Sequence, residues 1–334
     1  MKKYILLVSI ILFSACSSTQ KQNEVVIYTS VDQHYSEPIL AAFEKETGIH
    51  VRIAFDVEAS KTTGLVNRLI AEQKHPKADI FWNSEFVQTV RLASRGILAK
   101  YKAPTTDQML WSDPENRWSA FGGRLRVLIS NSEKISDSSL PHSLDDFLDP
   151  KYPADKIGIA LPLFGTTATH AAALWAQMGE SNTSKFFQNL KERGLSFVNG
   201  NSVVRDSVVN GQLWFGLTDS DDACAAAAKG KSINITFLDQ NPEDIGTLVI
   251  PNTVALIAGG PNPENGRKLI EYLLSHKTKE RLVELGWFHV DNGRITTATA
   301  CPLPSTIHMQ NISPDKIVES LEPSQNYLRK LLLR

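Results

Sequence analysis

The chain has 334 residues, which is too long for one small domain and predicts two lobes. Hydrophobic residues make up 42% of the chain and charged residues 21%, a globular composition that argues against a disordered chain and against a multi-span membrane protein. The formal net charge of −1 gives no indication of nucleic-acid binding.

The N-terminal segment has the layout of a bacterial export signal. Lysines at positions 2 and 3 precede an apolar run at residues 4–13, which is too short to span a membrane as a helix, and Cys16 follows. The end of this segment resembles a bacterial lipobox, in which the cysteine becomes the lipidated first residue of the mature protein. We therefore expect a signal peptide at residues 1–15, a lipid on Cys16 and a polar tether at residues 16–24. The alternative is an ordinary secretory signal with an incidental cysteine.

Residues 25–55 predict the unit around which the chain is organised: a strand, a polar loop, a helix and a second strand. β-Branched residues open the first strand, apolar side chains then recur at helical spacing, and Gly48 can end the helix in a left-handed conformation. Such a crossover predicts parallel strands. Ligands of open parallel sheets bind beyond the carboxyl ends of the strands, so we expect the loop at residues 29–35 to face a ligand.

The alternation of strands and helices continues along the chain. Further strands are expected at residues 78–82, 124–131, 157–161, 213–217 and 249–257. Further helices are expected at residues 60–72, 143–147, 168–178, 186–191, 203–210, 223–229, 265–275 and 278–285. Several strands end in short polar loops that lead directly into helices, so the ligand-facing architecture of the first unit is repeated. The strand at 124–131 is expected to cross between the lobes.

Two motifs connect this pattern to a known family. The chain resembles extracellular solute-binding proteins of ABC transporters, particularly the ferric-iron-binding group, in FEKETGI at residues 43–49 and in PKADIF at residues 76–81. The resemblance covers about residues 24–300. It implies an α/β fold of the type II periplasmic binding protein class, in which two α/β lobes are joined by crossing hinge strands. The first lobe would comprise residues 25–123 with 253–334, and the second lobe residues 124–252.

The resemblance also implies a set of metal ligands. The family's iron-binding members use a histidine in the first loop, a glutamate after the strand of the second motif and two adjacent tyrosines late in the second lobe. Here Asp32 stands at the histidine position, Glu85 lies within one residue of the glutamate, and Asp221 and Asp222 replace the tyrosine pair. These four carboxylates are the predicted metal ligands.

The chemistry of this group favours a cation. Asp219 adds a further carboxylate, and His34 adds a nitrogen ligand. Clustered carboxylates repel one another unless a cation neutralises them, and oxygen ligands suit Fe(III), another hard metal or an organic cation such as a polyamine. The alternative is structural: Asp219 or Ser220 caps a helix, with Asp221 and Asp222 in its first turn, where the macrodipole favours acids.

A second group of residues favours an anion. Ser30, the pair Thr166 and Thr167, and the pair Asn201 and Ser202 each lie in a loop that leads into an expected helix. Backbone amides at helix N-termini bind anions, so these loops predict an anionic ligand. The resemblance implies that this anion is of the phosphonate or phosphate type, alone or beside the metal. The alternative for each loop is ordinary helix capping.

The predicted function is the substrate-binding component of an ABC importer. It would capture ferric iron or another hard metal, with or without a synergistic anion, outside the cytoplasmic membrane and present it to a membrane permease. The alternatives are a receptor for a phosphonate-type anion or a polyamine, and an exported α/β hydrolase. The hydrolase is the less favoured, because the sequence contains no G-x-S-x-G, G-x-x-x-x-G-K, H-E-x-x-H or C-x-x-C motif.

The remaining predictions concern assembly and location. We expect a monomer in the periplasm or cell envelope, with no resident cofactor and no nucleic-acid partner. Cys224 and Cys301 lie far apart in the sequence and form either one disulfide or two buried free thiols.

Overall fold

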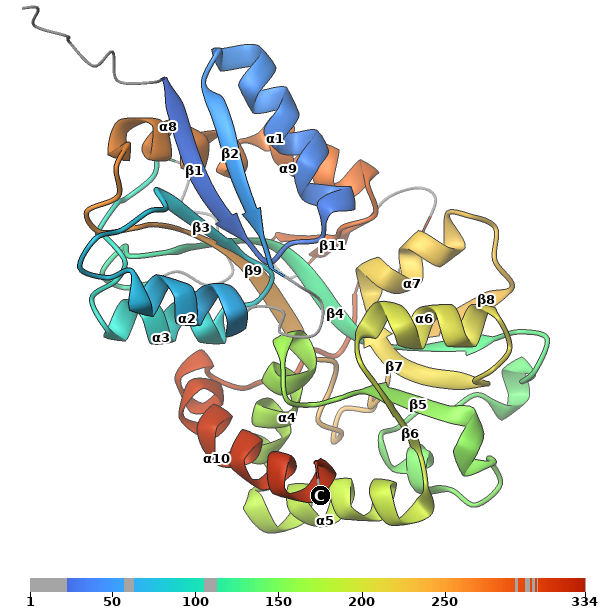
Figure 1. Cartoon of the computed structure of the whole chain (residues 1–334). Helices are drawn as coiled ribbons and strands as arrows, with labels where there is room; N and C mark the ends of the chain where they lie inside the picture. Colours follow the sequence, from blue (N-terminus) through green and yellow to red (C-terminus); the bar gives the residue numbers. More distant parts are fainter. Residues whose placement is uncertain are drawn as a thin grey trace, which may run out of the picture.

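The computed structural model describes residues 23–56, 63–104, 113–291, 294–297, 301, 304 and 306–333. The predicted signal peptide, Cys16 and all but the end of the predicted tether lie outside the described residues. Two α/β lobes lie next to each other and are joined by strands that pass from one to the other (Figure 1). The predicted two-lobe architecture with crossing hinge strands is confirmed.

One sheet runs through both lobes in the strand order β2-β1-β3-β9-β4-β7-β5-β6, with β8 also paired to β4. The first lobe contains β1 (Glu24–Thr29), β2 (His50–Phe55) and β3 (Ile80–Asn83). The second lobe contains β5 (Ile157–Ala160), β6 (Ser196–Val198), β7 (Phe215–Asp219) and β8 (Ile233–Thr236). The crossing strands are β4 (Ser119–Asn131) and β9 (Val249–Leu256). As expected for a crossover unit, β1 pairs in parallel with β2 and β3.

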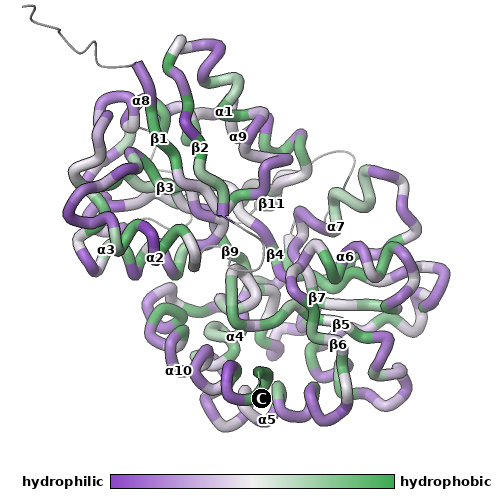
Figure 2. Tube along the Cα trace, viewed as in Figure 1, coloured by the Kyte–Doolittle hydropathy of each residue, from purple (hydrophilic) through white to green (hydrophobic). Residues whose placement is uncertain are grey.

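Helices cover the sheet in each lobe. Those of the first lobe are α1 (Gln33–Thr47), α2 (Thr63–Ala71), α3 (Val87–Ser94), α8 (Pro263–Leu274) and α9 (His276–Glu284). The second lobe carries α4 (Gly165–Met178), α5 (Glu180–Arg193), α6 (Asn201–Val209), α7 (Ser220–Ala227) and α10 (Pro314–Leu332), besides 3-10 turns at Asp137–Ser139, Asp145–Leu148 and Ala154–Lys156. A hairpin, β10 (His289–Asp291) and β11 (Arg294–Thr296), follows α9. The strands carry apolar segments, whereas the helices alternate between apolar and hydrophilic turns (Figure 2).

Each lobe has its own apolar core. Buried residues of β1, β3, α1 and α8, including Ile27, Phe43 and Leu269, form one core of the first lobe. Ile159, Phe215 and other buried residues form the core of the second lobe. Separate cores allow the lobes to move as units about the strands between them.

Most of the predicted helices begin earlier than the sequence predicts, and in four of them residues expected in a loop lie on the helix. α1 begins at Gln33, so His34 and Tyr35 lie on the helix and not in the preceding loop. α4, α6 and α7 begin at Gly165, Asn201 and Ser220, so the polar residues expected in their loops occupy first turns. The physical reason is that first-turn amide groups have no helical partner, so small and polar residues fit there as well as in a loop.

The crossing of the lobes is marked by a bulge in β4. The pairing of β4 with β9 shifts register between Phe121 and Arg124. Gly122 and Gly123 fill the bulge with φ values of +54° and +153°, which L side chains rarely adopt. A Cβ atom on Gly123 would lie 2.8 Å from the carbonyl oxygen of Ile250, so glycine is required there.

The C-terminal helix links the lobes at a second place. α10 packs against α4 and α5 of the second lobe and also contacts α3 of the first. An apolar cluster that includes Phe86, Ala172, Ile250 and Leu321 fills the space between them. The lobe boundaries remain a prediction, but the contacts of α10 lie mainly with the second lobe, whereas the sequence assigned residues up to 334 to the first. Its apolar stripe needs cover from α4, which a local pattern does not reveal.

Cys224 and Cys301 form a disulfide, with 5.3 Å between their Cα atoms, which decides between the two predicted alternatives. The bond ties α7 to the segment that follows β11.

None of the helices in the described part of the chain has the length and apolar character that a membrane span requires.

Candidate functional site

A cavity lies between the lobes, where the N-termini of α4, α6 and α7 approach the loops that follow β1 and β3. Its volume is about 40 Å³, whereas one water needs roughly 10–15 Å³, so it has room for a small ion with a few ligand atoms. It is lined by Asp32, Ser84, Arg124, Ala160, Leu161, Phe164, Gly165, Thr166, Thr167, Asn199, Gly200, Asn201, Ser202, Asp219 and Asp222. Both lobes and the hinge strand β4 therefore contribute to one site.

The structure brings most of the predicted site residues to this cavity. Those that line it are Asp32, Thr166, Thr167, Asn201, Ser202, Asp219 and Asp222. Those that do not line it are Ser30, His34, Glu85 and Asp221. The lining residues come from the carboxyl ends of strands β1, β5, β6 and β7, where ligands of such sheets bind.

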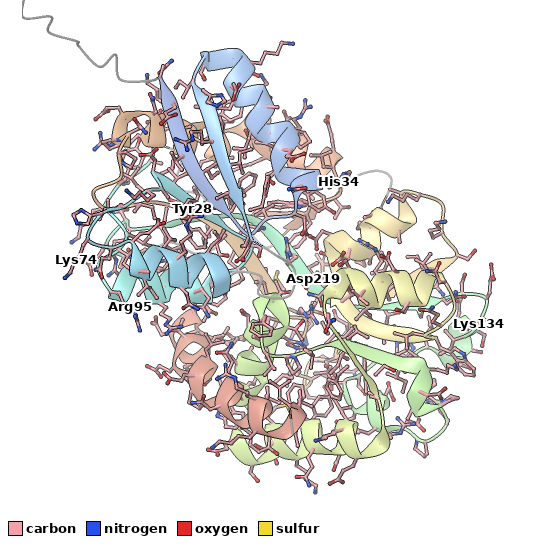
Figure 3. The ribbon with its side chains drawn as sticks, in the orientation of Figure 1. Tyr28, His34, Lys74, Arg95, Lys134 and Asp219 are labelled. Atoms are coloured by element: carbon pink, nitrogen blue, oxygen red, sulfur yellow. A yellow bond between two sulfur atoms is a disulfide. The ribbon has the colours of Figure 1, made fainter. Side chains whose placement is uncertain are left out.

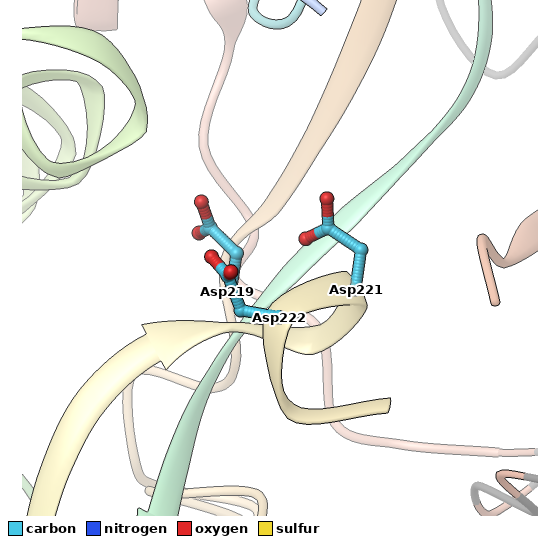
Figure 4. A group of neighbouring side chains, drawn as sticks. All are labelled: Asp219, Asp221 and Asp222. Atoms are coloured by element: carbon cyan, nitrogen blue, oxygen red, sulfur yellow. The ribbon is translucent and has the colours of Figure 1, made fainter. Parts of the chain in front are cut away.

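Three of the predicted carboxylates form a tight group. Oxygen atoms of Asp219, Asp221 and Asp222 lie within 4.8 Å of one another, one from each residue. Asp219 is the last residue of β7, and Asp221 and Asp222 lie in the first turn of α7 (Figure 4). Asp219 lies where the lobes meet (Figure 3). Hard metal ions bind oxygen ligands at about 2.0–2.6 Å, so one ion could contact oxygens spaced in this way.

Asp219 holds the second lobe together. Its carboxylate is 2.6 Å from Nη1 of Arg126 and accepts hydrogen bonds from Thr166 Oγ1 at 2.6 Å and Asn201 Nδ2 at 2.9 Å. Burial alone would raise the pKa of Asp219, but attraction to Arg126 and Arg124 and these hydrogen bonds lower it. Asp219 therefore stays ionised and joins β7 to the first turns of α4 and α6. It is the N-cap residue of α7 by position, yet its side chain makes no capping hydrogen bond.

The surroundings of Asp222 shift its pKa in the opposite direction to that of Asp219. Its carboxylate pairs with Arg205 at 2.8 Å. Burial, together with repulsion from Asp221, Asp32 and Asp219, raises its pKa well above the ordinary aspartate value. A cation placed between Asp222 and Asp32 would relieve this repulsion.

Sequence reasoning missed two buried arginines. Arg124 and Arg126 are each 3% exposed, and Arg124 lines the cavity with a guanidinium nitrogen 3.1 Å from Asp221. In the part of the chain that the structure describes, Nε of each arginine has no hydrogen-bond partner. The detectable signal was their spacing: residues two apart on a strand point to the same face, and both are charged in an apolar run.

Glu85 does not line the cavity, and its carboxylate accepts four hydrogen bonds. Its carboxylate accepts hydrogen bonds from the amides of Val87 at 2.6 Å and Gln88 at 3.0 Å, from Asn83 at 3.0 Å and from Thr169 at 3.1 Å. Burial raises its pKa, while these four hydrogen bonds oppose the increase. Glu85 thus caps α3 and joins the first lobe to α4 of the second.

Ser30 and His34 also take positions away from the cavity surface. The hydroxyl of Ser30 donates to Asn83 Oδ1 at 2.6 Å and accepts from the amide of Ser84 at 2.9 Å, which orders the two loops of the first lobe. His34 is exposed at the N-terminal end of α1 (Figure 3). Its ring makes an edge contact with Tyr35, at 5.1 Å between centroids.

The cavity has two walls of opposite electrostatic character. The first turns of α4 and α6 contain no acidic residue, and their N-terminal ends, with Arg124, make one wall attractive to anions. Asp32 and Asp222 make the other wall attractive to cations. The site can therefore hold a cation and an anion side by side, or one molecule that carries both charges.

Comparison with known proteins gives a consistent picture. Residues 75–317 match the profile of a family described as bacterial extracellular solute-binding proteins. The chain is 24% identical over 272 residues to the major ferric iron-binding protein of Neisseria meningitidis serogroup B, with 80% of each chain covered. It is 27% identical over 252 residues to a protein of Salmonella typhimurium named as a candidate 2-aminoethylphosphonate-binding periplasmic protein, covering 74% of this chain and 71% of that one.

The fold has close counterparts among solved structures. Iron-bound HitA from Pseudomonas aeruginosa superposes with a TM-score of 0.82 at 22% identity, covering 92% of this chain and 99% of that one. At this identity the match speaks for the fold and not for the ligand.

Proposed function

The chain belongs to the family of bacterial extracellular solute-binding proteins, and we propose that the solute it captures for an ABC importer is ferric iron, bound with an oxyanion between the lobes. The family and the fold are those of solute-binding transport proteins and not of enzymes. The predictions of a type II periplasmic binding protein fold and of a non-enzymatic transport function are thereby confirmed.

The group of carboxylates beside the cavity carries the proposal of iron. Asp32 and Asp222 line the cavity from opposite lobes, and Asp221 lies next to Asp222. Carboxylates that repel one another in this way favour a small, highly charged cation with a preference for oxygen, which describes Fe(III). The name of the Neisseria meningitidis relative supports the same choice.

These three aspartates are the metal ligands that we propose. Glu85, the fourth residue predicted as a ligand, is not included, because four donors already occupy its carboxylate. Asp219 supports the site through Arg126 and the helix N-termini.

Charge balance supports an oxyanion beside the metal. The site holds four aspartates, at positions 32, 219, 221 and 222, against three guanidinium groups, those of Arg124, Arg126 and Arg205. One net negative charge remains when all are ionised, and Fe(III) would change this to two net positive charges. A divalent oxyanion such as phosphate would neutralise them, with donors from α4, α6 and Arg124.

Calorimetry tests the proposal directly. Ferric nitrilotriacetate would be titrated into the wild type, with and without phosphate, and into Asp222→Asn. We expect the wild type to bind iron at one site, phosphate to strengthen binding, and the variant to lose at least about tenfold in affinity, because a charge-assisted contact is removed. Asp206→Asn is the matched control, since Asp206 also pairs with Arg205 but does not line the cavity. Equal affinities in wild type and Asp222→Asn would overturn the site.

The two opposite walls favour a second candidate, an aminoalkyl phosphonate. Its phosphonate would take the helix N-termini and Arg124, and its ammonium group would lie between Asp32 and Asp222. The Salmonella typhimurium relative supports this candidate. Binding of 2-aminoethylphosphonate without metal, together with no binding of ferric nitrilotriacetate, would replace iron with this ligand. The polyamine alternative is not retained, because the wall formed by α4, α6 and Arg124 would repel a polycation.

We also propose that the chain acts as a monomer, anchored to the membrane by a lipid on Cys16 and delivering its ligand to an ABC permease. The lysines, apolar run and cysteine at the N-terminus support the anchor. Wild type should partition with membranes, whereas Cys16→Ser should remain unprocessed or leave that fraction. An equal distribution of the two proteins would overturn the anchor.

A further inference from the structure

Tyr35 makes a hydrogen bond that crosses between the lobes beside the acidic wall of the cavity. Its hydroxyl, on α1 of the first lobe, donates to the main-chain carbonyl of Asp221, on α7 of the second lobe, at 3.1 Å. The two residues are 186 positions apart in the chain. Tyr35 is 4% exposed, so the bond lies out of water, where hydrogen bonds are strongest.

The ring of Tyr35 belongs to the core of the first lobe. It packs against Trp287 at 5.6 Å between centroids, and Trp287 in turn contacts Trp82 and Phe121. All four side chains belong to one buried apolar cluster. The first lobe therefore sets the position of the hydroxyl, and the hydroxyl is the group that reaches the second lobe.

The partner helix α7 has a covalent link and lies close to the first lobe. Cys224 lies one turn beyond Asp221 and is joined by a disulfide to Cys301. A Cβ atom on Gly286, next to Trp287, would lie 3.8 Å from Cβ of Cys224, so α7 abuts the first lobe. The hydrogen bond from Tyr35 therefore joins a buried ring of the first lobe to the main chain of a helix in the second.

The hydrogen bond from Tyr35 to Asp221 lies next to two of the proposed ligand-binding carboxylates. Asp32 is the N-cap of α1, and its carbonyl accepts a hydrogen bond from the amide of Tyr35 at 2.9 Å. Asp222 follows Asp221 in the first turn of α7. The hydrogen bond from Tyr35 to Asp221 therefore connects the start of α1, which carries Asp32, to the start of α7, which carries Asp222.

Tyr35 itself is placed to act through α7 and not on the ligand. It does not line the cavity. Its hydroxyl donates to a carbonyl oxygen, which can only accept, so the hydroxyl carries its proton in this contact. Coordination of Fe(III) by a tyrosine would require the phenolate instead.

We infer that Tyr35 is a positioning residue that latches the lobes closed, by holding the first turn of α7 against α1. The inference rests on the proposed function in that closure accompanies ligand binding. The latch itself is a property of the fold and applies to either candidate ligand.

Tyr35→Phe tests the latch because it keeps the ring and removes the hydroxyl. Tyr28→Phe is the matched control, since the hydroxyl of Tyr28 bonds to Glu72 within the first lobe at 2.9 Å. With ferric nitrilotriacetate plus phosphate as the probe, and 2-aminoethylphosphonate as a second probe, we expect Tyr35→Phe to raise the dissociation rate about threefold to tenfold. The association rate should change little, because Tyr35 does not line the cavity and does not meet the incoming ligand. The radius of gyration of the loaded variant should exceed that of the loaded wild type.

Three results would overturn the latch. The first is an unchanged dissociation rate and radius of gyration in Tyr35→Phe. The second is a visible phenolate-to-iron absorption band in the loaded wild type that is lost in this variant, which would make Tyr35 a metal ligand. The third is equal hydrogen exchange of the first-turn amides of α7 in ligand-free wild type and Tyr35→Phe, where we expect faster exchange in the variant.

Hydrogen exchange also separates the two proposals, because it needs no ligand. Failure of the wild type to bind either probe would overturn the proposed ligands. The exchange rates of α7 would still decide whether Tyr35 holds it.

Discussion

Asp219 and Asp222 lie in one turn of the chain, yet their pKa values are shifted in opposite directions. Asp219 lies between Arg126 and Arg124 and accepts hydrogen bonds from two side chains of the second lobe, so attraction outweighs its burial. Asp222 has Arg205 as its partner, while burial and three other aspartates oppose its ionised form. The first carboxylate is therefore structural, and the second is the group that a ligand cation would stabilise.

The raised pKa of Asp222 predicts the pH dependence of iron binding. As pH falls, Asp222 takes up a proton before an ordinary aspartate would, so affinity for Fe(III) should begin to fall above the usual carboxylate range. Competition with a chelator of known strength between pH 7.5 and pH 5 would measure it. Asp222→Asn should flatten the profile in the upper part of this range, and Asp206→Asn should not. A profile shared by wild type and Asp222→Asn would contradict the assignment.

The two aspartates also predict opposite effects on the stability of the ligand-free protein. The folded-state pKa of Asp219 is lowered, so its contribution is present above the unfolded pKa and is lost as pH falls through the folded value. The folded-state pKa of Asp222 is raised, so its ionised form destabilises the fold near neutral pH, and this cost disappears as pH falls.

Urea unfolding of two variants at pH 7.5 would measure these effects. Asp219→Asn should lower the free energy of unfolding by about 3 kcal/mol, because it leaves Arg126 buried without its charge partner. Asp222→Asn should raise it, since it removes the repelled charge. A loss of stability in Asp222→Asn as large as that in Asp219→Asn would show that both carboxylates are structural.

The two crossing strands, β4 and β9, are the elements that connect movement of the lobes to the cavity. β4 and β9 pair through the junction of the lobes, and the bulge at Gly122 and Gly123 breaks their register at that point. Arg124 follows the bulge directly and reaches Asp219 and Asp221. The part of the chain that must bend is thus next to a residue of the site, which connects lobe movement to the state of the cavity.

Gly123→Ala should therefore affect both stability and closure. The new Cβ would lie 2.8 Å from a backbone oxygen of β9 at a φ of +153°, so the crossing strands would have to move apart. We expect a loss of about 2 kcal/mol or more in the free energy of unfolding, together with weaker ligand binding. Gly230→Ala is the control, because it has a φ of +66° but no atom within 4 Å, and it should cost about 1 kcal/mol with unchanged binding. An equal loss of unfolding free energy in Gly123→Ala and Gly230→Ala would contradict a special role for the bulge.

For the whole molecule, the arrangement of separate cores about a shared site implies closure on the ligand. The cavity takes residues from both lobes, so a ligand completes its contacts when the lobes meet. Tyr35 and Thr169 provide hydrogen bonds from one lobe to the other in the present arrangement. The apolar cluster around α10 joins the lobes away from the cavity.

Small-angle scattering should detect this movement. The radius of gyration should fall when the protein is saturated with ferric nitrilotriacetate and phosphate, because the bound ligand favours the closed arrangement. Asp222→Asn at the same concentration should show a smaller change, in proportion to its lower occupancy. A radius that stays constant at saturation would indicate a rigid pocket.

The local sequence predicted the two lobes and most of the strands and helices, but not α3, α10, β8 or the hairpin of β10 and β11. Periodic apolar residues predicted the strands and helices, and the motif at residues 76–81 indicated the family, because these signals lie within a few neighbouring residues. Most of the predicted polar residues reached the cavity, since the carboxyl ends of parallel strands meet at one edge of a sheet. Helix starts were less accurate, because the same polar residues suit a loop and a first turn.

Tertiary structure alone decided which charges meet. Arg126 and Asp219 are 93 residues apart and pair because β4 and β7 are neighbours, an adjacency that neither segment encodes by itself. The same reason applies to the disulfide between Cys224 and Cys301 and to the bond from Tyr35 to Asp221. Glu85 looked like a ligand in the sequence, but the fold surrounds it with four donors. Periodicity is a property of a few consecutive residues, whereas ion pairing and burial depend on the packing of the whole chain.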